Sequence, residues 1–574
     1  MTPVPVDINA DPIGYSIQRT TNNGATWGPQ ISGTGIIAFD KEMIAADDVP
    51  ASPFANNLYC VWMGAGSAVQ FNRSTNQGTT FSNPLTLNDH WGQGANVQTG
   101  PNGEVYVCWA DYTNGNLPEQ GLGFVRSVNG GQNFTAASIV FNYTGIRNSS
   151  GGQTEFGGIR VNSFPSMAVD KSNGIFRGRI YIVYAAKENG NGKAIIQLRW
   201  SDNQGVNWSG PVTVSIANGR QNWFPWIAVD DNGIISIVYY SLDQSSGFST
   251  NTYVAISYNG GNTLSNQVVS SVAHTTAPIP EFGGGYTGDY IGITAYGWKA
   301  YPAWCDNRYG SQWQNYIDIV DNSPVITGIP AFCSSATYTA TNIPSNSTVT
   351  WSASPSGIIS LSPSGNQVIV NKITQGNVTL SALVNGSKTV SLNITTVPRS
   401  IINYSMYGSC VNGIQAWYLS ATSNMGSGTS WTWTVDNPGT SGIYIINPYS
   451  PSTYADVSKG GGVSLTYRDA CGEIAQRNGV TIYSPCGHSY VVSPNPATSI
   501  ITVSPANFSG AATNSTSTIS LINIYDGQAN LKKHQLFNKV ASASINVSDL
   551  PLGMYIIEII DGTNNERQKL QIIK

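Results

Sequence analysis

Short apolar runs alternate with polar turn residues along most of the chain. Between residues 40 and 320 an apolar run such as 224–229 leads through a turn rich in Asp, Asn and Gly. An aromatic-rich run such as 235–239 follows, and the order then repeats. Runs of this length, bounded by turn residues and rich in Val, Ile, Tyr and Trp, predict β-strands. We therefore expect an all-β protein.

One turn motif recurs between such strands. Residues 201–208 read SDNQGVNW, and four other segments share the frame of hydroxyl, any, Asn, any, Gly, any, any, large apolar. The five copies begin at residues 20, 74, 127, 201 and 257, so they are 54, 53, 74 and 56 residues apart. Spacing of this order indicates an array of supersecondary units. Asn bonds its own backbone and Gly supplies a positive φ, so each copy predicts a hairpin turn.

The motif resembles the Asp-box, or BNR, repeat of sialidase-like β-propellers. All five copies have Asn where that family usually has Asp, and Asn keeps the acceptor oxygen that the turn needs. The resemblance implies a propeller with these turns on its outer rim, away from the central site. It therefore predicts architecture and says little about chemistry.

The number of blades has two interpretations. The N-terminal hairpin could complete the last blade and give five, or it could be the remnant of a sixth. We favour a six-bladed ring with an incomplete first blade in residues 1–321, because the last unit supplies its own third strand. The complete units span 40–90, 93–142, 162–217 and 222–273, and the last unit, without the motif, spans 286–320.

Three further domains are expected after the ring. Residues 322–398 and 399–486 show alternating strands without the turn motif, and each has the size of an immunoglobulin-like sandwich. Both resemble the PKD- or Ig-like spacer modules of secreted bacterial proteins.

The last block, residues 487–574, carries PNP at 494–496, IYDGQ at 524–528 and LPLGMY at 550–555. It resembles the type A C-terminal sorting domain of the type IX secretion system of Bacteroidota. The resemblance implies export across the outer membrane by that machinery, followed by surface attachment or release.

Composition narrows the class of protein. Apolar residues make up 40% of the chain and charged residues only 10%, which suits an extracellular β protein. The net charge of −4 argues against nucleic acid or an anionic membrane as partner. No apolar stretch reaches about 18 residues, so no transmembrane helix is expected, and no signal peptide is visible at the N-terminus.

Seven cysteines are too few for a disulfide scaffold. Cys60, Cys108 and Cys305 lie in apolar strands and are expected to be buried thiols. One disulfide is plausible among Cys410, Cys471 and Cys486. No cofactor is expected. The acidic pairs Asp47–Asp48 and Asp230–Asp231 could hold a structural calcium ion, although such pairs at strand ends more often belong to turns.

Candidate site residues lie just before the innermost strand of each unit, where a propeller has a common mouth. Asp306 and Arg308, after the second strand of the last unit, could reach the same rim. We expect catalytic roles for Glu155, Arg160, Arg220, Glu281, Asp289, Tyr290 and Arg308, and binding roles for Asp40, Glu42, His90, Trp91 and Trp223.

The family resemblance implies a three-arginine clamp on a carboxylate, a Tyr/Glu nucleophile pair and an Asp acid/base. Arg160, Arg220 and Arg308 could form the clamp, with Glu155 or Glu281 beside Tyr290 or Tyr286. The family's early Arg-Ile-Pro motif is absent. Three functions therefore stay open: a secreted sialidase-like glycoside hydrolase or lyase, a non-catalytic propeller that binds glycan or protein, and an adhesin without a small-molecule site.

Overall fold

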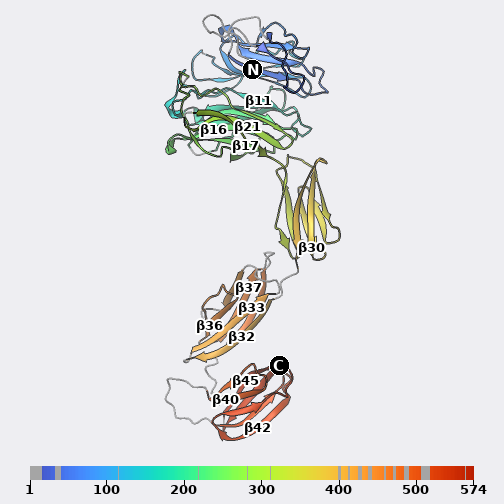
Figure 1. The fold of residues 1–574 in the computed structure, drawn as a ribbon, viewed down its shortest axis with the longest axis vertical. Coiled ribbons are helices and arrows are strands. Elements are labelled where there is room, and N and C mark those ends of the chain that lie inside the picture. The colour runs from blue at the N-terminus through green and yellow to red at the C-terminus, as the bar shows by residue number, and fades with distance from the viewer. Residues whose placement is uncertain are drawn as a thin grey trace.

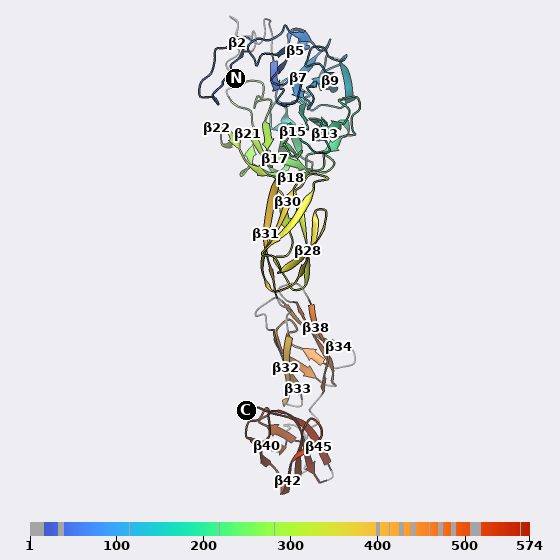
Figure 2. The ribbon, with the colours of Figure 1, turned by 90° about the vertical axis from the view of Figure 1, so that its right-hand side faces the viewer.

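The structure is a computed structural model. It describes residues 16–32, 40–113, 115–216, 219–280, 282–310, 312–397, 402–411, 414–423, 430–436, 438, 443–457, 460–468, 474–483, 490–505, 518–562 and 564–573. These residues are almost entirely strands and turns, as the sequence predicts. The chain forms a ring of small sheets at one end, followed by three β-sandwiches one after another (Figures 1 and 2).

The ring consists of antiparallel sheets that follow one another around a centre, an arrangement like that of a propeller (Figure 2). In each sheet the strand order follows the chain, and the first strands of neighbouring sheets contact one another, so the first strand lies innermost. The first two sheets contain β3 (Asp40–Ala46), β4 (Leu58–Met63), β5 (Val69–Ser74) and β6 (Leu85–Thr86), then β7 (Gly92–Thr99), β8 (Val105–Asp111), β9 (Gly121–Ser127) and β10 (Ser138–Asn142).

The third and fourth sheets contain β11 (Ser166–Val169), β12 (Ile180–Lys187), β13 (Ala194–Ser201) and β14 (Val212–Thr213), then β15 (Gln221–Val229), β16 (Ile235–Asp243), β17 (Ser249–Ser257), β18 (Ser265–Val268) and β19 (His274–Thr275). The fifth contains β20 (Gly292–Tyr296), β21 (Lys299–Tyr309), β22 (Gln312–Ile317) and β23 (Val320–Asp321). The short 3-10 turns are η1 (Ala65–Ser67), η2 (Thr154–Phe156), η3 (Glu188–Gly190) and η4 (Gln244–Ser246).

The second strands of the first four sheets are almost wholly buried, whereas β21 in the fifth sheet is buried mainly on one face. One apolar core runs from the third sheet to the fifth and includes Val183, Tyr239 and Trp304. Burial of each such side chain contributes roughly 1.5–3 kcal/mol to folding. The aromatic-rich runs in the sequence are therefore the layers that join one sheet to the next.

The N-terminal hairpin, β1 (Ser16–Ile17) with β2 (Ile31–Ser32), forms a two-stranded sheet in the described part of the chain. It lies against the first four-stranded sheet, where Ile17 packs on Cys60 and Trp62. The described strands of the last sheet pair with one another and not with this hairpin. The total number of blades stays a prediction.

The five turn motifs share one geometry. In the fourth copy the Ser201 hydroxyl accepts the Gly205 N–H at 2.8 Å, and Asn203 Oδ1 accepts the Asn207 N–H at 2.9 Å. The equivalent hydroxyl-to-glycine bond occurs in the other four copies. The motif glycine has φ between +75° and +92° in all five, a conformation in which a side chain would be strained. Asn in place of Asp therefore retains the turn.

Arginine side chains join neighbouring turn motifs. Arg73 Nη1 donates to Gly130 O at 2.6 Å and Arg126 Nη1 donates to Gln204 O at 3.2 Å. Arg19 and Arg179 make the matching bonds to Gln77 and Gly260. In every case the acceptor is the fourth residue of the next motif, so these arginines fasten each blade to its neighbour around the rim.

The sandwich nearest the ring has two four-stranded sheets around the core of Tyr338, Trp351 and Leu380. It meets the fifth turn motif, where the Ser345 N–H donates to Tyr258 O at 2.8 Å. Its strands are β24 (Val325–Thr327), β25 (Ala331–Phe332), β26 (Ser335–Thr341), β27 (Val349–Ser354), β28 (Ile359–Ser364), β29 (Gln367–Lys372), β30 (Gly376–Val384) and β31 (Lys388–Thr396).

The next two sandwiches each have their own core. The middle one contains β32 (Ile402–Val411), β33 (Ile414–Ser423), β34 (Ser430–Asp436), β35 (Ile443–Ile445), β36 (Ser452–Val457), β37 (Gly460–Arg468) and β38 (Ile474–Tyr483). The C-terminal one contains β39 (Tyr490–Ser493), β40 (Ile500–Pro505), β41 (Ile519–Tyr525), β42 (Leu531–Val540), β43 (Ala543–Asn546), β44 (Gly553–Asp561) and β45 (Asn564–Ile572).

The cysteines of the ring carry thiols. Cys60 and Cys108 are buried, as expected, and Cys305 is partly buried. Cys333, for which the sequence gave no expectation, is disulfide-bonded. The side chains of Cys410, Cys471 and Cys486 lie outside the described residues. No helix among the described residues is long and apolar enough to cross a membrane.

Candidate functional site

The predicted site residues that the structure describes lie towards one face of the ring. Each inner strand pairs antiparallel with the second strand of its sheet, so the start of the first adjoins the end of the second, as Gly92 adjoins Asp111. The turn motifs lie at the other end, because a third strand such as β13 ends at Ser201 beside the start of β12. The face at the starts of the inner strands, which we call the mouth, is therefore opposite the turn motifs.

Asp289 is the centre of a cluster that three parts of the ring build at the mouth. Lys41, at the start of β3, forms a close ion pair with Asp289, which precedes β20. Arg160, in the segment before β11, donates to Asp289 Oδ1 at 2.9 Å and also bonds the Tyr286 hydroxyl. We call Lys41, Arg160, Tyr286, Asp289 and Tyr290 the mouth cluster.

Electrostatics keep this cluster charged. The side chains of Lys41 and Asp289 are only 8% and 10% exposed. Burial alone would raise the pKa of Asp289, but the charges and hydrogen bonds of Lys41 and Arg160 hold that pKa below its usual range. Two cations therefore share one buried carboxylate, and the guanidinium of Arg160 also stacks on the Tyr286 ring, 3.7 Å from its centroid.

Tyr290 forms the aromatic side of the cluster. Its ring lies 6.0 Å from that of Phe164 and 5.8 Å from that of Trp226, measured between centroids. Its hydroxyl is buried and has no hydrogen-bond partner among the described residues. Burial, together with the negative charges of Asp289 and Asp40, raises the pKa of Tyr290 well above its usual value, so the hydroxyl stays protonated and can donate.

A chain of polar contacts extends the cluster towards the second sheet. Asp40 lies 3.3 Å from Lys41 Nζ and accepts from Gln93 Nε2 at 2.7 Å. Arg147 Nη1 donates to Gln93 Oε1 at 2.9 Å, and the backbone N–H of Arg147 bonds the fully buried Glu119. Burial raises the pKa of Glu119. The network orients both cations and carboxylates at the mouth.

His90 and Trp91 lie beside this network. The two ring nitrogens of His90 are each 2.6 Å from a carboxylate oxygen, of Asp89 and Asp111 respectively. Burial alone would lower the pKa of His90, but these two carboxylates raise it above its usual value. Trp91 stacks on Tyr112 with 4.2 Å between centroids, and its buried indole N–H has no partner among the described residues.

Arg220 and Arg308 are not joined to the mouth cluster by any contact among the described residues. Arg220 pairs with Asp243 at 3.1 Å, and Arg308 pairs with Asp306 at 2.7 Å while stacking on Tyr316. Each of the three predicted arginines therefore has a carboxylate partner of its own.

The remaining predicted residues are placed as follows. Glu155, on η2, pairs with Lys187 at 2.8 Å rather than with a tyrosine of the mouth. Trp223 is buried and packs against Phe156 and Tyr240. Glu42 is partly exposed on β3, near enough to influence Tyr290. Glu281 lies outside the described residues.

Sequence reasoning missed Lys41, Gln93 and Arg147, although it chose their neighbours Asp40, Glu42 and Trp91. Lys41 has φ of +64°, and the pairing of β3 with β4 shifts register between Asp40 and Met43. A bulge at that position redirects the side chain. Nothing in the sequence marks the bulge, so the pattern gave no sign that Lys41 reaches Asp289.

The cluster offers donors and cations rather than metal ligands. No group of three His, Cys, Asp or Glu side chains among the described residues could hold a metal ion. Asp47 and Asp230, considered for calcium, accept bonds from Ser52 and from the backbone of residues 232 and 234. Asp231 accepts from the Gly297 N–H. These carboxylates stabilise turns, and the calcium site stays a prediction.

Comparison with known proteins identifies the far end of the chain. Residues 491–574 match the family model of the secretion system C-terminal sorting domain. The C-terminal sandwich is a type IX sorting domain. It carries the PNP, IYDGQ and LPLGMY segments that predicted it. A protein with this domain is secreted or held at the outer surface of the cell.

Solved structures resemble part of the chain only distantly. A protein of unknown function from Dyadobacter fermentans is 12% identical, with a TM-score of 0.31, over 58% of this chain and 94% of that one. An α-L-arabinanase from Penicillium chrysogenum is 12% identical, with a TM-score of 0.33, over 62% and 93%. An ulvan lyase of polysaccharide lyase family PL25 is 12% identical, with a TM-score of 0.32, over 58% and 85%. Likenesses this low carry no argument about activity. No curated protein matches the chain.

Proposed function

We propose that the protein is a secreted or surface-held propeller that binds an extracellular glycan through the mouth cluster. The observation that carries the proposal is the buried Tyr290 hydroxyl. It belongs to a ring that lies near Lys41 and Asp289, and it bonds no described residue. A buried donor without a partner costs free energy, and a ligand oxygen would supply that partner.

The chemistry around Tyr290 fits a sugar. The rings of Trp226 and Trp91 are only partly buried and offer apolar surface, while Lys41 and Arg160 offer donors for hydroxyl or carboxylate oxygens. Binding sites of this kind combine an apolar lining with a few fixed polar groups. The sorting domain supports the extracellular setting in which such a ligand is met.

The proposal includes the domain organisation expected from the sequence. A sialidase-like propeller in residues 1–321, six-bladed with an incomplete first blade, would be carried on two Ig-like spacers, 322–398 and 399–486. Residues 487–574 would form the sorting domain that follows these spacers. The repeated turn geometry and the separate cores of the sandwiches support this division.

A glycan-cleaving enzyme is the second candidate. It is favoured by Asp289 and Tyr286, an ionised carboxylate and a phenol that both bond Arg160. A sialidase-like mechanism with three arginines on one carboxylate has less support, because Arg220 and Arg308 pair with Asp243 and Asp306 instead. Binding without turnover is therefore the function that the geometry supports best.

Tyr290→Phe tests the proposal without disturbing the fold. The variant removes only a hydroxyl that bonds no described residue, so thermal stability should be unchanged or slightly higher. Glycan affinity should fall about five- to tenfold, the contribution of one hydrogen bond. The full-length protein is screened on a glycan array, and the affinity for the best glycan is measured by calorimetry. Sugar release from that glycan is followed in parallel.

Tyr296→Phe is the matched control, because Tyr296 ends β20 on the opposite face and is 73% exposed. It should bind as the wild type does. Absence of any glycan binding by the wild type would contradict the proposal. Equal affinity of Tyr290→Phe and wild type would show that the glycan binds elsewhere. Sugar release that Tyr290→Phe abolishes would favour the enzyme.

A further inference from the structure

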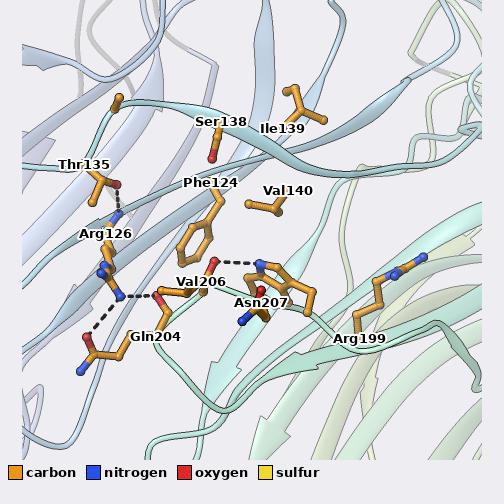
Figure 3. Close-up of a pocket in the computed structure, with 13 residues that line it drawn as sticks. Phe124, Arg126, Thr135, Ser138, Ile139, Val140, Arg199, Gln204, Val206 and Asn207 are labelled. Atoms are coloured by element: carbon orange, nitrogen blue, oxygen red, sulfur yellow. Dashed lines mark hydrogen bonds between the residues drawn. The ribbon is translucent and has the colours of Figure 1, made fainter.

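A groove of about 520 Å³ lies on the rim of the ring, where the second and third sheets meet (Figure 3). One wall is β10, from Ser138 to Val140, and the other is the fourth turn motif, from Gln204 to Trp208. The motif lies at the end of the sheets opposite the mouth, so the groove is separate from the mouth cluster.

The charged side chains that line the groove are all basic. Its lining contains Arg126 and Arg199 and neither Asp nor Glu, although the whole chain has a net charge of −4. The Gln204 side-chain amide, which lines the groove, donates to the carboxylate of Glu104 outside it. The two arginines lie on opposite sides of Phe124 and Val206 in Figure 3. A ligand with negative charge is therefore favoured here.

Both guanidinium groups are fixed in place but keep donors to spare. Arg126 Nη1 bonds the backbone and side chain of Gln204. Arg199 bonds the Tyr184 hydroxyl through Nε and Ser209 O through Nη1. For neither arginine does Nη2 bond another described residue. Fixed guanidinium groups with remaining N–H donors suit carboxylate or sulfate oxygens.

The rest of the lining suits a sugar more than a peptide strand. Trp208 is partly buried, packs edge-on against Phe124 and bonds Gly205 O, so its ring is held rigidly. Thr135, Ser138 and Asn207 add polar side chains. β10 is an edge strand, to which a peptide could add, but its pairing is bulged between Ile139 and Phe141. Bulges of this kind oppose pairing at a sheet edge.

We propose that this groove is a second binding site, for an acidic oligosaccharide whose anionic groups pair with Arg126 and Arg199. It does not depend on the mouth cluster. The anionic group is a carboxylate, as in a uronic acid, or a sulfate ester, and both would meet the same guanidinium donors. An oligosaccharide held at the rim would stay attached while another part of the same oligosaccharide reaches a different site.

The test adds a charge without removing a contact. Val206 is 61% exposed in the groove, so Val206→Glu should fold normally and repel an anionic ligand. Full-length protein is titrated by calorimetry with hexasaccharides of hyaluronan, chondroitin sulfate and cellulose. Acidic hexasaccharides should bind, cellohexaose should bind more weakly, and affinity should fall as salt is raised. Val206→Glu should weaken acidic binding about tenfold or more.

Val128→Glu is the matched control, because Val128 is 64% exposed in the third turn motif and outside the groove lining. It should bind as the wild type does. Tyr290→Phe should also retain this binding, which separates the groove from the mouth. Binding of hyaluronan indicates the carboxylate, and binding of chondroitin sulfate alone indicates the sulfate.

Three results would overturn the proposal. Cellohexaose could bind as tightly as the acidic sugars, which would remove the role of charge. Val206→Glu and Val128→Glu could have equal affinities, which would place the ligand elsewhere. A glutamate-rich peptide could bind more tightly than the acidic sugars and lose its affinity in Val206→Glu, which would make the groove a peptide site.

Discussion

At the scale of single residues, Asp289 determines the chemistry of the mouth. Among the described residues it is the one carboxylate that both Lys41 and Arg160 contact, and it lies almost buried beside Tyr290. The sequence predicted Asp289, Arg160 and Tyr290 because each precedes an inner strand. It could not predict that Lys41 joins them, because that contact spans 248 residues and depends on a bulge in β3.

Asp289→Asn should destabilise the ring by about 3 kcal/mol at neutral pH, because two largely buried cations lose their shared anion. The pKa of Asp289 is lowered from its ordinary value of 3.8. Its stabilising effect is therefore present above pH 3.8 and is lost as the pH falls through the lower folded-state pKa. Urea unfolding followed by tryptophan fluorescence at pH 7 and in acid should show the difference between wild type and variant shrinking in acid.

Asp202→Asn provides the comparison, because Asp202 pairs with Arg179 but is 60% exposed. An exposed pair contributes about 1 kcal/mol or less. If the two variants lose equal stability at neutral pH, Asp289 does not have the special role assigned to it here.

At the scale of elements, the turn motif is the best-predicted feature, because its hydrogen bonds are local. Ser201, Asn203 and Gly205 form in the structure the turn that their spacing predicts. The arginine that precedes the motif in three copies, at residues 19, 73 and 126, was a visible signal that we did not use. Its partner belongs to the next blade, so local patterns alone do not show what it does.

Arg73→Met should weaken the junction between the first and second four-stranded sheets. The variant keeps an apolar side chain but loses the bond to Gly130 O, which contributes on the order of 1 kcal/mol. Amide hydrogen exchange should become faster in both the second and the third turn motif. Mass spectrometry of deuterated peptides measures this directly.

Arg177→Met is the control, since the Arg177 side chain bonds, within the described part of the chain, only the carbonyl groups of Lys171 and Ser172 in its own turn. Its exchange should change in that turn alone. Faster exchange confined to the second motif in Arg73→Met would show that the arginine supports its own turn and does not join two blades.

The pairing of strands also explains why the sequence alone could not show whether the three arginines meet at the mouth. Arg220 precedes β15 and Arg308 ends β21, so both were expected at the mouth. Asp243 comes beside Arg220 through the pairing register of β15 with β16, which residue spacing does not reveal. Asp306 lies two residues before Arg308 on the same strand, so that neighbour was visible in the sequence. Both carboxylates engage the arginines before any ligand does.

At the scale of the whole molecule, the two ends of the chain differ in how much of their structure and function the sequence predicts. The sorting domain was predicted from three short segments in order, and the family model confirms it. The ring was predicted as an array of sheets, but its site depends on contacts between residues such as Gln93 and Asp40, which lie in different blades. Secretion is therefore shown, whereas the ligand is proposed.

A crystal structure of the full-length protein with the glycan selected on the array tests the central claim most directly. We expect density for the sugar at the mouth, with an oxygen within hydrogen-bond distance of the Tyr290 hydroxyl and contacts to Lys41 or Arg160. A sugar that leaves Tyr290 without a partner, and that lies away from the mouth cluster, would contradict it.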